Sequence, residues 1–423
     1  MSGDLSRVRR NVGWKLAGTV ADKGLRLLLV IVATRTLGDA LYGRFAYVAA
    51  TTALFAQVTD LGTGLFLTRE TARLGRLDPA LVGGLLALRR WLGLGYLLAV
   101  CGLALAHHEE PWLALALVAA GVGALGQSSL EACWAVFRGV QRLRLEARSQ
   151  ALHSAFFAGG GLLVVALLGL GVLPHDDRAV FALTLAALVA VAFALVLAAK
   201  SALVLVRPEG RFDAALRARW LRDGLPIGLA IMASMVYFKL DVPMLRWLRG
   251  DAETGTYAAA FRLLEMAAIA PAVLMSAAFP ALAEAVARDR AAARALHRKA
   301  LLMLAGLGGA LALGVGLFAD AWIALLYGPA FAASAEPLQT LAPAIGLSYV
   351  NYLETHMLIA IGAVRWQLGL SVLLGVANLG MNAVWIPTLG ARGAALATVA
   401  TELLLLLGAM PMVAHALRSE PTP

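Results

Sequence analysis

Charged residues are scarce in this sequence. Only 15% of its 423 residues are Asp, Glu, Lys or Arg, whereas 61% are hydrophobic and the mean hydropathy is +0.78. A soluble domain has about a quarter of its residues charged, and a soluble core does not need so much apolar surface. The composition therefore predicts a polytopic membrane protein. It argues against a soluble enzyme, a nucleic-acid-binding domain and a secreted disulfide scaffold.

Several chemical motifs are also missing. The two cysteines, Cys101 and Cys133, lie in apolar segments and form no CxxC, so neither a disulfide framework nor a thiolate metal site is expected. There is no GxxxxGK[ST] loop, no HExxH, no Cys/His cluster and no acidic pair within one loop. These absences argue against ATP hydrolysis, a metal centre and membrane-embedded catalysis. We expect no catalytic residue, no metal and no cofactor, apart from a coupling proton or sodium ion.

Apolar stretches of about 20 residues are long enough to cross a bilayer as helices. Division at charge clusters, proline and glycine predicts an all-α protein with twelve transmembrane helices. The first stretch follows the basic start MSGDLSRVRR, but it is long and carries Lys15 and Asp22, so we expect it to be retained rather than cleaved. The predicted spans are 12–36, 45–68, 81–106, 112–137, 149–173, 179–200, 225–248, 256–283, 299–319, 338–361, 366–386 and 393–415.

The positive charges predict the orientation. With the N-terminus in the cytoplasm, the inside segments carry 23 Lys and Arg residues and the outside segments carry four. Cytoplasmic loops of membrane proteins collect such residues, which also accounts for the net charge of +10 without a nucleic-acid partner. We expect a multi-pass protein of the bacterial cytoplasmic membrane with both termini cytoplasmic.

The sequence contains an internal repeat. GDALYGRFA at 38–46 matches GDAETGTYA at 250–258 at five of nine positions, with an offset of 212 residues. Each segment follows the first predicted span of a six-helix half, and an even number of spans gives both halves the same orientation. This predicts two parallel six-helix repeats around a central cavity, as in alternating-access transporters. The expected division is a lobe at 1–200, a basic cytoplasmic linker at 201–224, of which 212–220 is a candidate interfacial helix, and a lobe at 225–423.

Charged groups within the predicted spans are the most informative residues, because they are costly in lipid and usually face a protein interior or a wet cavity. Asp22 and Arg26 are four residues apart and are expected to pair, as are Arg262 and Glu265. Arg89 is expected to pair with Glu131, which lies at a comparable depth. Pro243 is expected to interrupt the seventh predicted span, and the eighth carries Pro271 and Pro280 below Arg262 and Glu265.

The deep basic groups predict an anionic cargo. A diphosphate fits, because Arg and Lys both bind phosphate oxygens. The candidate substrate-binding residues are Lys23, Arg26, Lys239 and Arg262. The candidate ion-coupling residues, for a proton or sodium ion, are Asp60, Asp241, Glu265, Glu354 and Glu402.

Four stretches resemble the polysaccharide flippases, of the kind that export O-antigen and exopolysaccharide units (Wzx-type), in the multidrug/oligosaccharidyl-lipid/polysaccharide exporter superfamily. They are LVIVATRTLGDALYGRFAY at 29–47 with TDLGTGLFLTRETAR at 59–73; YFKLDVPMLRWLRGDAETGTYAAAFRLLE at 237–265 with FPALAE at 279–284; ALLYGPAFAASAEPLQTLAP at 324–343; and NLGMNAVWIPTLGARGAALATVATELLLLL at 378–407. They cover both halves, and their order and spacing carry the resemblance.

The resemblance implies two lobes that rock between inward- and outward-facing states. It implies flipping of a polyprenyl-diphosphate-linked oligosaccharide from the cytoplasmic to the outer leaflet for cell-surface polysaccharide biosynthesis, driven by an ion gradient or the membrane potential. The implied partners are this cargo, membrane lipids, and polysaccharide polymerase and glycosyltransferases. By helix and depth, Lys23, Arg26 and Arg262 match the family's cationic cavity residues.

Three other functions remain open. A cation or drug antiporter of the same superfamily has the same helix count, and it would need a net acidic cavity dominated by residues such as Asp60, Asp241 and Glu354. An enzyme acting on polyprenyl lipids would need an acid/base cluster at one membrane face. An inactive scaffold of flippase-like fold is the third.

Overall fold

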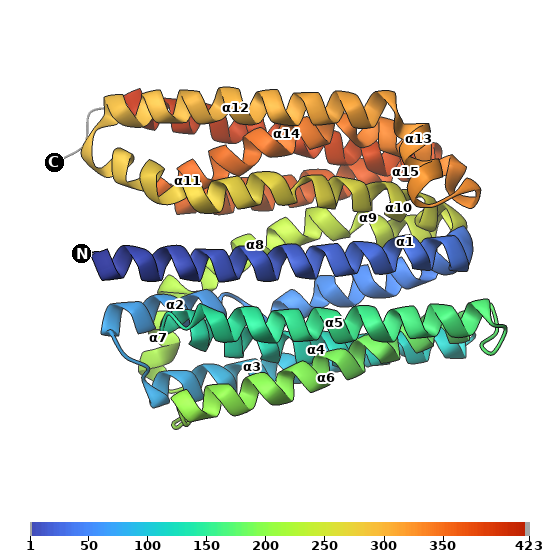
Figure 1. Ribbon diagram of the computed structural model, residues 1–423, viewed down its shortest axis with the longest axis horizontal. Coiled ribbons are helices and arrows are strands. Elements are labelled where there is room, and N and C mark those ends of the chain that lie inside the picture. The colour runs from blue at the N-terminus through green and yellow to red at the C-terminus, as the bar shows by residue number, and fades with distance from the viewer. Residues whose placement is uncertain (1, 419–423) are drawn as a thin grey trace. The chain divides into compact units, whose positions relative to one another are not determined.

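The computed structural model describes the backbone of residues 2–418 and the side chains of residues 22–275 and 278–418. Within residues 2–418 the regular elements are all helices and no strand occurs (Figure 1). This confirms the predicted all-α class. The chain forms two compact units, unit 1 at 1–232 and unit 2 at 233–423. The division falls inside helix α8, beyond the segment 201–224.

Unit 1 contains six long helical spans and two short helices, and the start of α8. Its extensive contacts are those of α4 with α6 and of α1 with α5. The helices are α1 (Ser2–Asp60), α2 (Thr63–Leu74), α3 (Pro79–Ala106), α4 (Pro111–Gly139), α5 (Leu143–Gly169), α6 (Asp177–Leu205), α7 (Ala214–Asp223) and α8 (Leu225–Lys239).

Unit 2 continues from the second half of α8. Helix α14 lies at its centre, in contact with α10, α11, α12 and α15. The elements are α9 (Asp241–Arg249), α10 (Asp251–Ala267), α11 (Ile269–Arg288), α12 (Arg290–Leu317), α13 (Ala319–Leu326), the 3-10 helix η1 (Pro329–Ser334), α14 (Ala335–Ala360) and α15 (Val364–Arg418).

Eight helical segments in the described part of the chain are long and apolar enough to cross a membrane. They hold nine of the predicted spans, because α15 is broken at Gly390 and carries two. The other three predicted spans lie on α14 and on the two parts of α1, which contain more polar residues. The protein is therefore a multi-pass membrane protein with six spans in each half.

The internal repeat is preserved in the backbone. Gly38 breaks α1 at φ 73° and ψ 177°, and Gly250 separates α9 from α10 at φ 91° and ψ −176°. L-residues rarely adopt this conformation, so glycine is required at both positions. Each glycine ends the first span of its half and is followed by an aspartate, which confirms that the two sequence segments build equivalent turns.

Two spans of unit 2 are broken shortly before a proline, and the sequence predicted the break at Pro243. The break between α8 and α9 falls at Leu240, three residues before Pro243, and the break between α10 and α11 falls at Ala268, three residues before Pro271. A proline ring clashes with the carbonyl group four residues earlier and removes one helical hydrogen bond. The candidate site residues Lys239 and Asp241 therefore flank a helix break.

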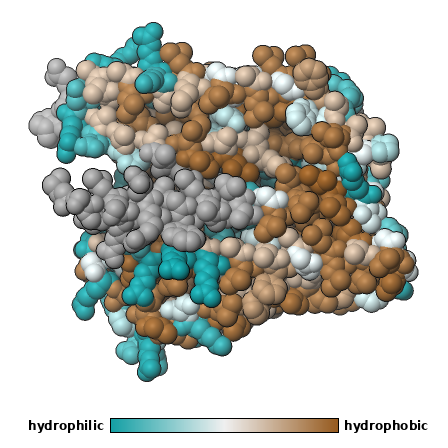
Figure 2. Space-filling view, in the orientation of Figure 1, coloured by the Kyte–Doolittle hydropathy of each residue, from teal (hydrophilic) through white to brown (hydrophobic). Residues whose placement is uncertain are grey.

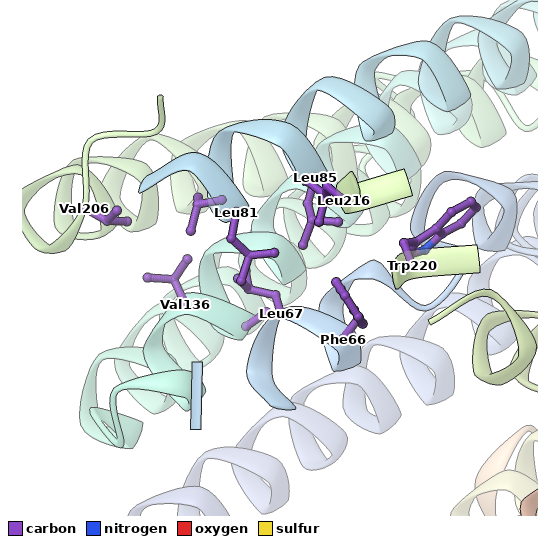
Figure 3. Close-up of a cluster of buried hydrophobic side chains, with 10 residues drawn as sticks. Phe66, Leu67, Leu81, Leu85, Val136, Val206, Leu216 and Trp220 are labelled. Carbon is purple, nitrogen blue, oxygen red and sulfur yellow. The ribbon is translucent and has the colours of Figure 1, made fainter. Parts of the chain in front are cut away.

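The segment 201–224 packs on unit 1, and the interfacial position of its helix stays a prediction. Helix α7 covers part of it, but Leu216 and Trp220 are buried among side chains of α2 and α3, including Phe66, Leu81 and Leu85 (Figure 3). Leu216 and Trp220 are therefore covered by protein, whereas Leu221 of the same helix is 48% exposed.

The surface of unit 2 suits a lipid environment. Along α12, Leu302, Leu313 and Leu317 are each at least 65% exposed. In Figure 2 hydrophobic side chains cover the length of the visible helices of this unit, and hydrophilic ones gather where α11 runs into α12. Exposed leucine on this scale is unfavourable in water but matches the acyl chains of a bilayer.

Candidate transport sites and comparison with known proteins

Asp22 and Arg26 form the predicted pair on α1. Arg26 Nε donates to Asp22 Oδ1 at 2.7 Å, and Ser154 of α5 donates to the same oxygen. The Arg26 guanidinium also lies 4.8 Å from the centre of the Phe157 ring and 3.5 Å from His153 Nδ1. Helix α5 therefore fixes the orientation of both charges.

The cations of this cluster are more exposed than its acid. The Asp22 side chain is 8% exposed, that of Arg26 is 34% exposed, and Lys23 is exposed. Two cations thus adjoin one carboxylate, and the cluster presents net positive charge. The side chain of Lys15, which belongs to the same predicted stripe, lies outside the described residues.

Asp60 pairs with Arg89, which corrects the expected pairing of Arg89 with Glu131. Arg89 also donates to Thr63 Oγ1 at 2.6 Å and to the Ser128 carbonyl oxygen at 2.6 Å. Glu131 instead accepts a 3.4 Å hydrogen bond from Gln127. The prediction compared depth along straight helices, whereas the break after Asp60 brings its carboxylate beside α3.

Asp60 also stabilises the start of α2. Its carboxylate accepts the backbone N–H groups of Gly62 at 3.2 Å and Gly64 at 3.1 Å, and the Thr63 hydroxyl at 3.1 Å. These are the unpaired donors of a helix N-terminus, where negative charge is favourable. A cavity of about 150 Å³ adjoins the pair. Its polar lining comes from Asp60, Thr68, Arg89, Glu131 and Arg138.

In unit 2, Glu265 is shared by two cations. Lys239 donates to its Oε1, and Arg262 Nη1 donates to its Oε2 at 2.7 Å, which confirms the predicted Arg262–Glu265 pair. The side chain of Arg262 is 37% exposed, and those of Lys239 and Glu265 are 25% and 23% exposed. This triad carries a net charge of +1, as does the Lys23–Asp22–Arg26 cluster in unit 1.

Asp241 and Glu402 lie in the core of unit 2. Asp241 is 1% exposed and accepts hydrogen bonds from the Tyr257 hydroxyl and from the Val242 backbone N–H at 2.9 Å. Glu402 is 4% exposed and accepts a 2.6 Å hydrogen bond from Asn351 Nδ2. Neither carboxylate is paired with Lys or Arg in these contacts, so neutral donors satisfy both.

Glu354 is paired with a residue that the sequence analysis missed. Glu354 is 0% exposed, and its Oε1 lies 2.8 Å from His297 Nε2. The predicted span began at residue 299 and left His297 in a loop, whereas α12 begins at Arg290. A histidine three residues after Arg294, in line with one helical face, was the signal available in the sequence.

The predicted site residues therefore fall into separate clusters within the two units. Lys23 and Arg26 lie together, Lys239, Arg262 and Glu265 lie together, and the remaining four carboxylates each have their own donors. Among the described residues no three His, Cys, Asp or Glu side chains come together as metal ligands. The assignment of binding and coupling roles to these residues stays a prediction.

Comparison with known proteins places the chain in a family. Residues 8–286, more than half of the chain, match the family described as polysaccharide biosynthesis protein. The chain belongs to this family. No curated protein sequence matches it.

Several solved structures share the fold of this chain. An inward-facing multidrug resistance MATE family transporter of the MOP superfamily has a TM-score of 0.78 at 17% identity, covering 95% of this chain and 96% of its own. The lipid II flippase MurJ in an inward closed conformation has a TM-score of 0.74 at 13% identity, covering 94% and 87%. A MOP superfamily transporter from Pyrococcus furiosus Vc1 (DSM3638), described by the reverse polarity of its binding pocket, has a TM-score of 0.59 at 17% identity, covering 97% and 94%.

Proposed function

We propose that the protein flips a polyprenyl-diphosphate-linked oligosaccharide from the cytoplasmic to the outer leaflet by alternating access, coupled to an ion gradient. Cell-surface polysaccharide biosynthesis is the process that it serves, in the cytoplasmic membrane of a bacterium with both chain termini inside. Membership of the polysaccharide biosynthesis family supports this process. The similarity of fold to MATE transporters and to the lipid II flippase supports transport across the membrane.

One observation supports an anionic cargo above the others. In each unit an arginine pairs with one carboxylate, Arg26 with Asp22 and Arg262 with Glu265, and this arginine is more exposed than the acid. A lysine adds a second cation in each case: Lys23 is adjacent to Asp22 in the sequence, and Lys239 pairs with Glu265. Surplus guanidinium and ammonium groups in a membrane-spanning segment bind phosphate oxygens through charge-assisted hydrogen bonds. The four cations are the predicted set Lys23, Arg26, Lys239 and Arg262.

A cationic cargo would need accessible carboxylates. Asp241, Glu354 and Glu402 are each at most 4% exposed, and Asp60 is paired with Arg89. The P. furiosus transporter, whose binding pocket is described as having reverse polarity, belongs to the same superfamily as the multidrug transporters. Its description supports the view that binding pockets of different polarity occur on one fold.

The proposal is tested by flipping of a fluorescent polyprenyl-diphosphate oligosaccharide in proteoliposomes. Arg262→Ala leaves Lys239 and Glu265 as a neutral pair, so we expect the rate to fall ~10-fold or more, the cost of one hydrogen bond to a charged group. Arg262→Lys keeps the charge and should retain more activity than the alanine variant.

Arg288→Ala is the matched control, because Arg288 pairs with Glu284 at an exposed helix end. Arg288 is the last residue of α11, whereas Arg262 lies on the preceding helix, α10. We expect Arg288→Ala to flip the cargo at the wild-type rate. Failure of folded wild-type protein to flip the lipid, together with export of a cationic dye, would contradict the proposal and favour the drug antiporter.

A further inference from the structure

One carboxylate oxygen in the core of unit 2 has no partner. Glu354 of α14 is fully buried, and while its Oε1 contacts His297 Nε2 at 2.8 Å, its Oε2 has no hydrogen-bond partner. Buried polar atoms are nearly always satisfied, and an exception calls for an explanation. The side chain of His297 is 12% exposed, so it links the buried carboxylate to the surface of the unit.

We propose that His297 and Glu354 together bind the coupling proton of the transport cycle. This inference rests on the proposed function and narrows its ion-coupling part to one pair and one ion. With one added proton the pair is net neutral, whether the proton lies on the imidazole or on the carboxyl group. Without it, Glu354 would be buried as an uncompensated anion, which is costly in an apolar interior.

The other candidate carboxylates have different partners. Asp60 is paired with Arg89, and Glu265 with Lys239 and Arg262. A guanidinium does not release its proton in a protein, so protonation of these acids would break an ion pair without a compensating change in the partner.

The hydrogen-bond donors of Asp241 and Glu402 are a tyrosine, a backbone N–H and an asparagine. None of these groups titrates near neutral pH. Only Glu354, among the five candidates, contacts a histidine, the side chain whose charge changes between about pH 5 and 8. The pair can therefore take up or release a proton with a change in both partners.

The pair lies close to one end of unit 2. His297 is seven residues from the start of α12, and Glu354 is six residues from the end of α14. At a rise of about 1.5 Å per residue, both are on the order of 10 Å from their helix ends. Figure 2 shows hydrophilic side chains gathered at this end of the unit, which the positive charges predict to be cytoplasmic.

Most charged groups on the elements around α14 are engaged elsewhere or exposed. On α12, Arg294 donates to the Leu417 carbonyl oxygen at 3.1 Å, and Arg298 and Lys299 are exposed, whereas Arg290 is half-buried and its Nε and Nη1 have no hydrogen-bond partner. His356, on α14 itself, has its Nδ1 2.6 Å from the Tyr352 carbonyl oxygen. Among the other charged groups, Glu402 of α15 accepts from Asn351, Arg262 and Glu265 of α10 pair with each other, and Glu284 and Arg288 of α11 pair with each other.

The ligand chemistry favours a proton over sodium. A sodium ion is a hard cation that takes several oxygen ligands, as calcium and magnesium do. Glu354 Oε1 contacts an imidazole nitrogen, and Glu354 Oε2 has no hydrogen-bond partner. One proton satisfies this arrangement without further ligands.

The test measures flipping of the diphosphate lipid in proteoliposomes at symmetric pH and with a proton gradient. For wild type we expect the gradient to raise the rate ~5-fold or more, the lower end of typical coupling. Glu354→Gln mimics a permanently protonated acid, and His297→Gln removes the titratable partner. Both should lose the stimulation by the proton gradient, measured relative to the rate that each variant has at symmetric pH.

His356→Gln is the matched control, because His356 lies two residues from Glu354 on the same helix and should keep the stimulation. Wild-type stimulation in either folded Glu354→Gln or His297→Gln would overturn the proposal. Stimulation of wild type by a sodium gradient instead of a proton gradient would overturn it as well.

A second readout needs no cargo. The infrared C=O stretching band of a protonated carboxyl group should change with pH in wild type and in His356→Gln, shift its pH dependence in His297→Gln, and disappear in Glu354→Gln. If the band persists unchanged in Glu354→Gln, the proton site is wrong. If the band behaves as expected but wild type flips no diphosphate lipid, the proposed cargo is wrong and the proton site stands.

Discussion

Asp60 illustrates how a charge is accommodated inside the membrane-spanning part of this protein. It receives Arg89 from α3 and the first backbone N–H groups of α2. Arg89 is 8% exposed and has Ser128 and Thr63 as further acceptors. The carboxylate therefore both neutralises a buried guanidinium and caps a helix, and these two roles can be separated by mutation.

Asp60→Asn removes the charge but keeps an amide oxygen for the N–H groups of α2. We expect destabilisation on the order of 3 kcal/mol, because the variant leaves Arg89 buried without its counter-charge. Thermal unfolding in detergent measures it, with Glu284→Gln, in an exposed pair, as a control that should not change the midpoint. Adding Arg89→Met to Asp60→Asn should recover stability, and an Asp60→Asn variant as stable as wild type would contradict this role.

The sequence predicted contacts within a helix better than contacts between helices. Asp22 with Arg26 and Arg262 with Glu265 follow from spacings of four and three residues on one helical face. The partner of Arg89 was predicted wrongly, because it depends on how the chain turns after Leu61. His297 was missed because basic residues made the start of α12 look like a loop, although the helix extends nine residues further.

At the scale of elements, the contact between the α1–α2 break and the start of α8 is built on glycine. Leu61 has φ 35° and Gly62 has φ 80°, and Trp220 Nε1 donates to the Leu61 carbonyl oxygen at 3.3 Å. A Cβ atom at Gly228 would meet the Leu61 carbonyl group and the Gly62 nitrogen. Backbone therefore packs directly on backbone at this point of unit 1.

Gly228→Ala should lower the stability of unit 1 by roughly 1–3 kcal/mol, the usual cost of overpacking, because the new methyl group must displace backbone rather than a flexible side chain. Gly102→Ala is the control, since nothing lies within 4 Å of a Cβ at that position of α3, and alanine is the better helix former. Thermal unfolding of the two variants side by side gives the comparison. Equal midpoints would show that the contact at Gly228 is not tight.

The helix break at Pro243 was predictable from sequence, and the role of α7 was not. Pro243 acts through a steric clash within one helix, whereas the break near Pro271 was not predicted and Pro280 lies inside α11 without a break. Helix α7 has an apolar face with Leu216 and Trp220, and a sequence alone does not say whether lipid or protein covers such a face. Burial against α2 and α3 depends on the path of the chain after Leu61.

At the scale of the whole molecule, the internal repeat supports the two-lobed fold and the distribution of charge supports an anionic cargo. Gly38 and Gly250 adopt the same backbone conformation in equivalent turns, and a two-to-one excess of cations over acids recurs in each unit. The number of spans was predictable from composition, the repeat from two matching segments, and the family from the resemblance of four sequence stretches. The central cavity and the cargo stay predictions, because they depend on how the units face each other during transport.

The measurement that tests the central claim most directly compares two lipids in proteoliposomes. Both carry the same fluorescent oligosaccharide and the same polyprenyl tail, and only one has the diphosphate between them. If Lys23, Arg26, Lys239 and Arg262 recognise the diphosphate, the charged lipid should flip ~10-fold or more faster than the phosphate-free one. Equal rates for the two lipids would contradict the claim that surplus cations select an anionic cargo.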